Sequence, residues 1–282
     1  MKRVIVIFAA LLGIGFLAVV SVGWLLAHPV QTRIGNPPSD LKAKAITFAS
    51  DSGTNVHGWW CPIQNGRGAV LLLPGIRANR LSMVDRARFL RRAGYSVLLI
   101  DFQATGESKG DHITFGWKES HDVLAAITFV RRVDPNDRIA IVGSSLGGVA
   151  ALLATPPLKV DALVLEAVYP TIEIATRNRM EKYLGVFGRM ATPVLLKQLQ
   201  WRLGISASQL RPIDHIATIE CPMLIMSGEK DRNTRVSDTR VLFEHARSPK
   251  ELWFVPNAGH VDLHRAARED YETRVLAILA RM

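Results

Sequence analysis

The stretch Gly143-Ser144-Ser145-Leu146-Gly147 decides the fold of this 282-residue chain. It lies between a strand-like run, 138–142, and a helix start rich in small residues, 148–154. A serine hydroxyl is a poor nucleophile, and a sharp strand-to-helix turn exposes it to a base. Glycines two residues before and after the serine remove Cβ atoms that would collide in such a turn. Of the two adjacent serines, only Ser145 has both glycines, and Ser144 does not. The alternative is an ordinary glycine-rich turn, but the placement between strand and helix favours Ser145 as a nucleophile.

Short apolar runs alternate with amphipathic stretches along most of the chain. An opening hairpin is predicted over 46–49 and 56–61, with its turn at 51–53. Nearly continuous apolar runs follow at 69–73, 97–100, 139–142, 162–165, 223–226 and 252–255. Helical patterns occupy 81–93, 117–132, 145–154, 236–246 and 262–279. Continuous apolar runs are typical of parallel strands covered on both faces. The rhythm therefore predicts an α/β fold with a mostly parallel, eight-stranded sheet between helices.

Two residues at the ends of later strands complete a predicted catalytic group. Asp231 follows the run 223–226, and His260 follows the run 252–255. Ligands of such sheets bind beyond the carboxyl ends of the strands, where Ser145 also falls. A nucleophilic serine needs a base, and the base needs a carboxylate that holds its tautomer. The spacing therefore predicts His260 as the base and Asp231 as the orienting acid.

Other residues in the same segments could take the role of the acid, and the histidine could instead bind a metal. The acid role is open to three others, Glu229, Asp238 and Asp262. His260 and His264 are four residues apart, a spacing that binds metal on some helices. However, Val261 stands where the zinc proteases carry a glutamate beside the first histidine. We therefore expect no metal and no cofactor.

Acyl transfer also needs N–H donors for the developing oxyanion, each worth about 10²- to 10³-fold in rate. The backbone N–H of Leu146, directly after the nucleophile, is one predicted donor. The loop after the strand 69–73 is expected to supply the other. Pro74 has no N–H and Gly75 permits a turn, so Ile76 is the predicted second donor. The alternative is a plain Pro-Gly turn that ends the strand.

The amino-terminal run 4–27 carries no charged residue and follows Lys2 and Arg3. As a helix it covers roughly 36 Å, which is enough to span a bilayer. We expect an uncleaved membrane anchor that places the soluble domain in the periplasm or outside the cell. The stretch 21–23 also resembles a signal-peptidase site, so secretion after cleavage stays an alternative. Residues 28–40, with three prolines, are predicted as a stiff linker.

Composition narrows the class of protein. With 48% hydrophobic residues, the chain is expected to form one catalytic domain, 41–282, behind the appendage 1–40. Lysine and arginine are scattered, so the net charge of +10 does not predict a nucleic-acid partner. The default interpretation of this charge is a solvated basic surface, and anionic lipid is a more suitable partner for it than nucleic acid.

Cys61 and Cys221 lack metal or redox spacing and are predicted to be buried, with a disulfide between them as the less favoured alternative.

The strand–helix rhythm breaks between Tyr169 and Cys221. A mainly helical insertion, about 171–220, is predicted to hang over the strand ends as a lid. Its apolar residues are expected to pack on the body and line an acyl pocket, or simply to form the core of the lid itself. They are Ile172, Tyr183, Leu184, Phe187, Leu195, Leu196, Leu199 and Trp201.

Together these residues resemble the α/β-hydrolase superfamily over roughly 45–279. The branch most similar is that of lipase-like and serine aminopeptidase-like hydrolases, which often carry an amino-terminal membrane anchor. The stretch 101–108 resembles the D-x-R-G-x-G-x-S loop of this family, and 116–122 is similar to the opening of its next helix. The chain departs from the family pattern at Pro74, where histidine is usual, and at Gln103-Ala104, where arginine and glycine are usual. We expect these departures to affect the type of substrate more than the two backbone N–H groups predicted to bind the oxyanion.

The resemblance and the predicted triad imply a serine hydrolase that cleaves a carboxylic ester of a small-molecule acyl substrate. An acyl-enzyme on Ser145 would be its intermediate. Amide or peptide hydrolysis by the same triad is the first alternative. A membrane-tethered scaffold that kept the fold without turnover is the second. The sequence predicts neither the acyl preference nor the oligomeric state.

Overall fold

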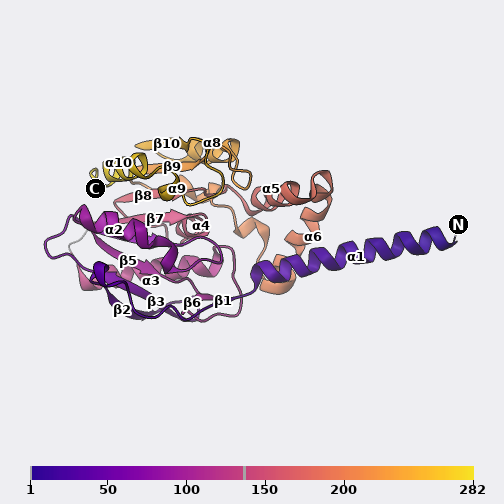
Figure 1. Cartoon of the computed structure of the whole chain (residues 1–282), viewed down its shortest axis with the longest axis horizontal. Helices are drawn as coiled ribbons and strands as arrows, with labels where there is room; N and C mark the ends of the chain where they lie inside the picture. Colours follow the sequence, from indigo (N-terminus) through magenta and orange to yellow (C-terminus); the bar gives the residue numbers. More distant parts are fainter. Residues whose placement is uncertain (1, 136–137) are drawn as a thin grey trace.

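The computed structural model describes residues 2–135 and 138–282, without the side chains of residues 5–12. Its main sheet has eight strands: β2 Lys44–Ala49, β3 Asn55–Cys61, β4 Ala69–Leu73, β5 Ser96–Ile100, β7 Ile139–Ser144, β8 Ala162–Glu166, β9 Met223–Gly228 and β10 Lys250–Val255. Their order across the sheet is β10-β9-β8-β7-β4-β5-β3-β2 (Figure 1). Neighbouring strands are parallel except at β2–β3 and β3–β5. The predicted eight-stranded, mostly parallel sheet is confirmed.

Helices cover both faces of this sheet. They are α2 Val84–Arg92, α3 Trp117–Val133, α4 Leu146–Leu152, α8 Val236–His245, α9 Leu263–Ala266 and α10 Arg268–Leu279. In β4, Leu71 and Leu73 pack into the core that holds α3 and α4, while Val70 and Leu72 pack into the core that holds α2 and α10. Successive side chains of a strand point to opposite faces. Because both faces are covered, the strand reads as an unbroken apolar run.

Both cysteines are buried beside this sheet and are free thiols. Cys61 ends β3, and Cys221 lies just before β9. Burial raises the pKa of the Cys61 thiol to about 11 and that of Cys221 to about 12. The two residues therefore act as small apolar side chains in the core, as predicted.

Four helical segments occupy the stretch between β8 and β9. They are α5 Ile172–Leu184, α6 Val186–Leu203, η3 Ala207–Gln209 and α7 Ile213–Ile216. Thr171 caps α5 by accepting a hydrogen bond from the N–H of Ile174 at 3.3 Å. A Cβ at Gly188 would lie 2.4 Å from the carbonyl oxygen of Met180, so glycine permits the close packing of α6 on α5. Figure 1 places α5 and α6 beyond the sheet, on the side where the chain begins.

Helix α1, Lys2–Ala27, begins far from the body and ends beside α6 (Figure 1). The predicted anchor falls on this helix, but the side chains of residues 5–12 lie outside the description. Across the part of the chain that is described, no helix combines the length and the apolar character needed to cross a membrane. The transmembrane part of the prediction is therefore not confirmed.

The segment predicted as a linker lies against the body. Strand β1, Val30–Gln31, pairs in parallel with β6, Thr105–Gly106. The carboxylate of Glu107 accepts hydrogen bonds from the N–H groups of Ile34 and Gly35 at 3.0 and 3.1 Å. A strand of two residues carries no periodicity, so the sequence gives no sign of this pairing. These contacts hold the end of α1 in one place.

Candidate active site

Ser145 stands at the turn between β7 and α4 with a strained backbone. Its φ of 48° and ψ of −109° are unusual for any residue except glycine and cost about 1–3 kcal/mol. A Cβ at Gly143 would lie 2.6 Å from the backbone nitrogen of Gly148, and one at Gly147 would lie 2.4 Å from the carbonyl oxygen of Leu73. Both distances are too short for real atoms, so the turn requires glycine at both positions.

Asp231 and His260 meet beyond the ends of β9 and β10. The Nδ1 atom of His260 lies 2.7 Å from Oδ2 of Asp231. The carboxylate is fully buried, and its Oδ1 accepts hydrogen bonds from the N–H groups of Asn233 and Thr234 at 2.7 and 2.9 Å. An aspartate that accepts from Nδ1–H leaves the lone pair of a neutral imidazole on Nε2. The pair is therefore arranged to present a base.

The three competing acids have other partners. Glu229 accepts a hydrogen bond from the N–H of Asn257 at 3.1 Å. Asp238 accepts one from the N–H of Arg235 at 2.9 Å. Asp262 forms an ion pair with Arg86, as described below. Within the described residues, Asp231 is the one of the four predicted acids that is hydrogen-bonded to His260.

The loops after β9 and β10 are joined to each other, which places Asp231 beside His260. The N–H of Lys230 donates to the carbonyl of Ala258 at 2.8 Å, and the N–H of Glu229 donates to that of Val255 at 3.0 Å. A Cβ at Gly228 would lie 2.4 Å from the carbonyl oxygen of Ala258. Only glycine permits this approach of the two loops.

The predicted oxyanion donors lie on either side of the serine. The loop that carries Ile76 touches the elbow, because a Cβ at Gly75 would be in contact with the Cβ of Ser145 at 3.8 Å. Leu146 is the first residue of α4, where backbone N–H groups have no partner inside the helix. Among the residues that the structure describes, neither the Ile76 nor the Leu146 N–H donates to a protein acceptor. Both donors are therefore available to a ligand.

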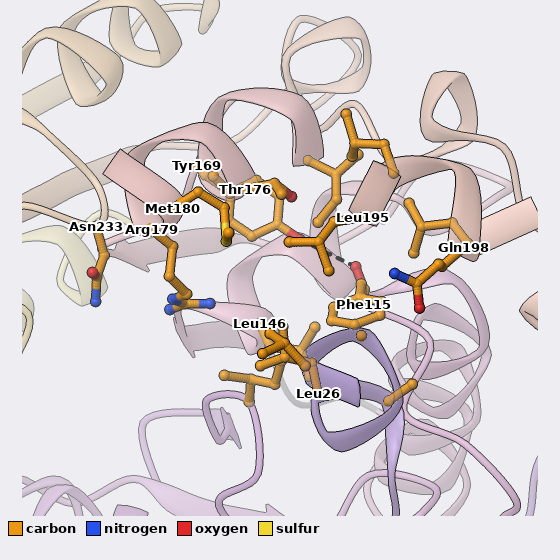
Figure 2. Close-up of a pocket in the computed structure, with 18 of the residues that line it drawn as sticks. Leu26, Phe115, Leu146, Tyr169, Thr176, Arg179, Met180, Leu195, Gln198 and Asn233 are labelled. Atoms are coloured by element: carbon orange, nitrogen blue, oxygen red, sulfur yellow. Dashed lines mark hydrogen bonds between the residues drawn. The ribbon is translucent and has the colours of Figure 1, made fainter. Parts of the chain in front are cut away.

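A cavity of about 340 Å³ lies beside the serine and the histidine, and Figure 2 shows part of its lining. Ser145, His260, Ile76 and Leu146 line it, and most of the remaining wall is apolar. In the described structure no hydrogen bond joins the Ser145 hydroxyl to the His260 ring. Catalytic hydrogen bonds often tighten only when substrate is bound, so this arrangement stays compatible with proton transfer. The size and apolar character of the cavity suit a small molecule with a hydrocarbon part.

The loop that departs from the family pattern is supported by buried hydrogen bonds. The side-chain amide of Gln103 donates to the carbonyl of His112 at 2.8 Å and to the Glu119 carboxylate at 2.7 Å. Its backbone N–H donates to Asp122 at 2.8 Å, and the hydroxyl of Ser50 donates to the same carboxyl group at 2.6 Å. Burial outweighs these bonds and raises the pKa of Asp122 from 3.8 to about 7. Gln103 therefore holds the loop where arginine is usual.

A buried charged cluster lies under the elbow. Arg86 contacts Glu166 at 2.7 and 2.9 Å, and its guanidinium also reaches Asp262 at 2.8 Å and the hydroxyl of Tyr271 at 3.1 Å. Burial raises the pKa of Tyr271 well above its ordinary value. The backbone carbonyl of Glu166 accepts a hydrogen bond from the N–H of Ser145 at 2.7 Å. The cluster thus links the elbow to the segment that follows the histidine.

Sequence reasoning did not find every residue of the cavity. Among those it missed are four residues from the last turns of α1, which the sequence indicated only as an apolar run, and two cations, Arg179 of α5 and Arg202 of α6. Of the apolar residues predicted for the lid, Ile172, Tyr183, Leu195, Leu196 and Leu199 line the cavity, although Tyr183 is largely exposed. Leu184, Phe187 and Trp201 do not line it and are exposed. No periodicity in the sequence distinguishes these two groups.

An eight-stranded α/β sheet with a strained serine at a strand-to-helix turn defines the α/β-hydrolase class. The sequence profile of the Alpha/beta hydrolase family matches residues 70–273, and the chain belongs to this family. The uncharacterized protein YfhR of Salmonella typhi is 28% identical over 233 residues, which cover 80% of this chain and 77% of that protein. The uncharacterized protein YqkD of Bacillus subtilis is 25% identical over 248 residues, 86% of this chain and 81% of its own length.

Among solved structures, the Pyrococcus furiosus esterase Pf2001 superposes with a TM-score of 0.73. The match covers 91% of this chain and 98% of the esterase, at 22% identity. At this identity the likeness concerns the fold. The family and the fold are therefore established.

Proposed function

We propose that the protein is a serine hydrolase that cleaves a carboxylic ester through an acyl-enzyme. One observation carries the proposal: the strained Ser145 and His260, which is hydrogen-bonded to the buried Asp231, line a single mostly apolar cavity. Ile76 and Leu146 line it too, and their backbone N–H groups have no acceptor among the described residues. This set contains a nucleophile, a base with its orienting acid and an oxyanion site. The fold that the chain shares with a protein named as an esterase is a supporting analogy.

In the proposed reaction, the serine, the histidine and the two N–H groups have separate roles. Nε2 of His260 takes the proton of Ser145 Oγ while Oγ attacks the acyl carbon. The N–H groups of Ile76 and Leu146 stabilise the oxyanion of the tetrahedral intermediate. The carbon–oxygen bond of the ester then breaks, and His260 gives its proton to the leaving alcohol. A water molecule, deprotonated by the same histidine, releases the acid and restores Ser145.

A fluorophosphonate probe with a nitrophenyl ester panel tests this proposal. We expect the wild type to be labelled and to hydrolyse esters, and Ser145→Ala to lose both properties. Ser144→Ala is the matched control because it removes the adjacent hydroxyl, which lacks the flanking glycines, and it should keep labelling and turnover. A folded wild type that resists labelling would favour the scaffold alternative. Faster cleavage of aminoacyl anilides than of esters would favour the amidase alternative.

We also propose that α1 attaches the enzyme to a membrane, with the catalytic domain on the exported side. The uncharged run behind Lys2 and Arg3 supports this orientation. Large apolar side chains are exposed on α1, α5 and α6, among them Phe16, Trp24, Phe187 and Trp201. Fractionation should leave the full chain in carbonate-washed membranes, and added protease should digest it only from the exported side. Recovery in the soluble fraction at full length would refute the attachment.

A further inference from the structure

The last turns of α1 form part of the wall of the catalytic cavity. Four of its residues, Val22, Gly23, Leu26 and Ala27, line the same space as Ser145. Figure 2 shows Leu26 at the end of this helix, facing a cavity that Leu195 and Gln198 of α6 border from the other side. A segment that served only as a tether would have no reason to reach the nucleophile.

Direct contacts hold α1 against the lid helix. The side-chain amide of Gln198 donates to the carbonyl of Val19 at 3.2 Å, and Arg202 donates to that of Val20 at 3.4 Å. A Cβ at Gly23 would lie 2.4 Å from Oε1 of Gln198. The atoms nearest this position belong to the flexible end of the Gln198 side chain, so α1 and α6 are in direct contact here.

The end of α1 is also joined to the loop that carries an oxyanion donor. The guanidinium of Arg77 donates to the carbonyls of Leu25 and His28 at 2.6 and 3.3 Å. Arg77 follows Ile76 directly and has a φ of 60°, so its backbone belongs to the turn that aims the Ile76 N–H. The carbonyl of Ala27 accepts a further hydrogen bond, from the N–H of Ile113 at 2.9 Å. These contacts satisfy terminal carbonyls of α1 and fix its position.

We propose that the carboxyl-terminal turn of α1 is the wall that contacts the acyl chain, and that Leu26 sets the longest acyl group accepted. This inference rests on the proposed esterase function. The cavity of about 340 Å³ leaves room for a medium hydrocarbon chain, so one added ring in the wall occupies a substantial part of it. Cleavage after residue 23 would remove part of this wall, so the inference also requires that the helix stays attached.

A comparison of two neighbouring leucines tests the proposal in the full chain. Leu26 lines the cavity, whereas the side chain of Leu25 is outside it and 53% exposed. We expect Leu26→Trp to lower the octanoate-to-acetate ratio of kcat/KM for nitrophenyl esters by about 10-fold or more. Leu25→Trp adds the same ring on the same helix and should keep the ratio within about twofold of wild type. Equal ratios in the two variants would overturn the proposal.

A smaller side chain at Leu26 provides a second test if tryptophan at this position disturbs folding. Leu26→Ala enlarges the cavity, so relative kcat/KM for decanoate should rise, while Leu25→Ala should leave it unchanged. A fall or no change in Leu26→Ala would also overturn the wall assignment. Loss of the underlying esterase function has a different signature, because the wild type would then hydrolyse neither the short nor the long esters.

A separate observation concerns Arg179 of α5. Figure 2 shows this side chain reaching into the cavity on the same side as Asn233. Among the described residues Arg179 has no hydrogen-bond or ion-pair partner, although the cavity is mostly apolar. An unpaired cation facing a catalytic cavity is suited to an anionic substrate group.

The geometry points to a binding site for an anionic group on the leaving alcohol. His260 gives its proton to that alcohol, so the alcohol departs on the side of His260. Asn233 belongs to the loop of Asp231, and its carbonyl accepts a hydrogen bond from Asn178 of α5 at 3.1 Å. Arg179 is thus placed on the side of the leaving group, and Figure 2 shows it beside Asn233 and apart from Leu26 of α1.

Two acetate esters of equal size separate charge from shape. We expect wild type to prefer the ester of 4-hydroxybenzoate to that of neutral 4-hydroxybenzamide, and Arg179→Gln to lower this preference about 10-fold. Arg179→Lys should recover part of it. Arg177→Gln, on the same helix but outside the cavity, should keep the preference within about twofold. An equal preference in Arg179→Gln and Arg177→Gln, or a wild type that prefers the neutral ester, would overturn the assignment.

Discussion

Arg86→Met is expected to destabilise the fold severely because it breaks a buried charge pair. The guanidinium of Arg86 contacts both carboxylate oxygens of Glu166, and both side chains are almost fully buried. It also lies over the ring of Tyr271, with its carbon 5.3 Å from the ring centre. Methionine has a similar length but no charge, so the variant leaves the Glu166 carboxylate without a counter-charge in the core.

The size of the effect follows from burial. Removal of one partner from a buried ion pair costs about 3–5 kcal/mol. Arg88→Met is the matched control, since it removes the same charge from the same helix. The ion pairs of Arg88 with Asp40 and Asp85 are exposed, and exposed pairs contribute about 0–1 kcal/mol. We therefore expect a difference of roughly 2–5 kcal/mol in the free energy of unfolding between the two variants.

Urea unfolding followed by circular dichroism measures this difference directly. Thermal unfolding should show Arg86→Met melting roughly 6–20 °C below wild type. If that variant is too unstable to purify, Arg86→Lys, which keeps the charge and loses the paired hydrogen bonds, should be intermediate. A free energy of unfolding for Arg86→Met within about 1 kcal/mol of the Arg88→Met value would refute the reasoning that the buried cluster supports the elbow.

Three further variants probe the site. Asp231→Asn should lower kcat for a nitrophenyl ester about 10⁴-fold without unfolding, and unchanged turnover would reassign the acid. Gly147→Ala, whose Cβ would collide with the backbone of Leu73, should lower kcat at least about 10-fold, whereas Gly15→Ala, in open space, should not. The carboxyl of Asp122 keeps its proton in the folded state up to a pKa of about 7, so its contribution makes stability fall as pH rises from about 4 to about 7. Asp122→Asn should flatten this decline, by on the order of a few kcal/mol in urea titrations, and an unaltered pH slope would contradict the raised pKa.

Most of the residues at the candidate active site could be predicted from the sequence, because the end of a strand is visible in the sequence as the end of an apolar run. Unbroken apolar runs locate β7, β9 and β10, and the residues just after each run must emerge at one edge of a parallel sheet. Ser145, Asp231 and His260 follow these runs and are therefore predicted at the same edge of the sheet. The sequence favoured Asp231 among four acids, but which of them contacts His260 depends on how the two loops after β9 and β10 hydrogen-bond to each other.

The sequence by itself therefore determined the family, the strands after which the candidate catalytic residues follow, and the identity of those residues. Only the tertiary structure decided that the end of α1 reaches the cavity, that Arg179 lines it with no partner among the described residues, and that Leu26 lines it while Leu25 does not. The physical reason is that periodicity reports which residues avoid water, whereas a pocket depends on which distant surfaces meet. An apolar run such as 4–27 indicates which residues avoid water, but it does not indicate which other segment they contact.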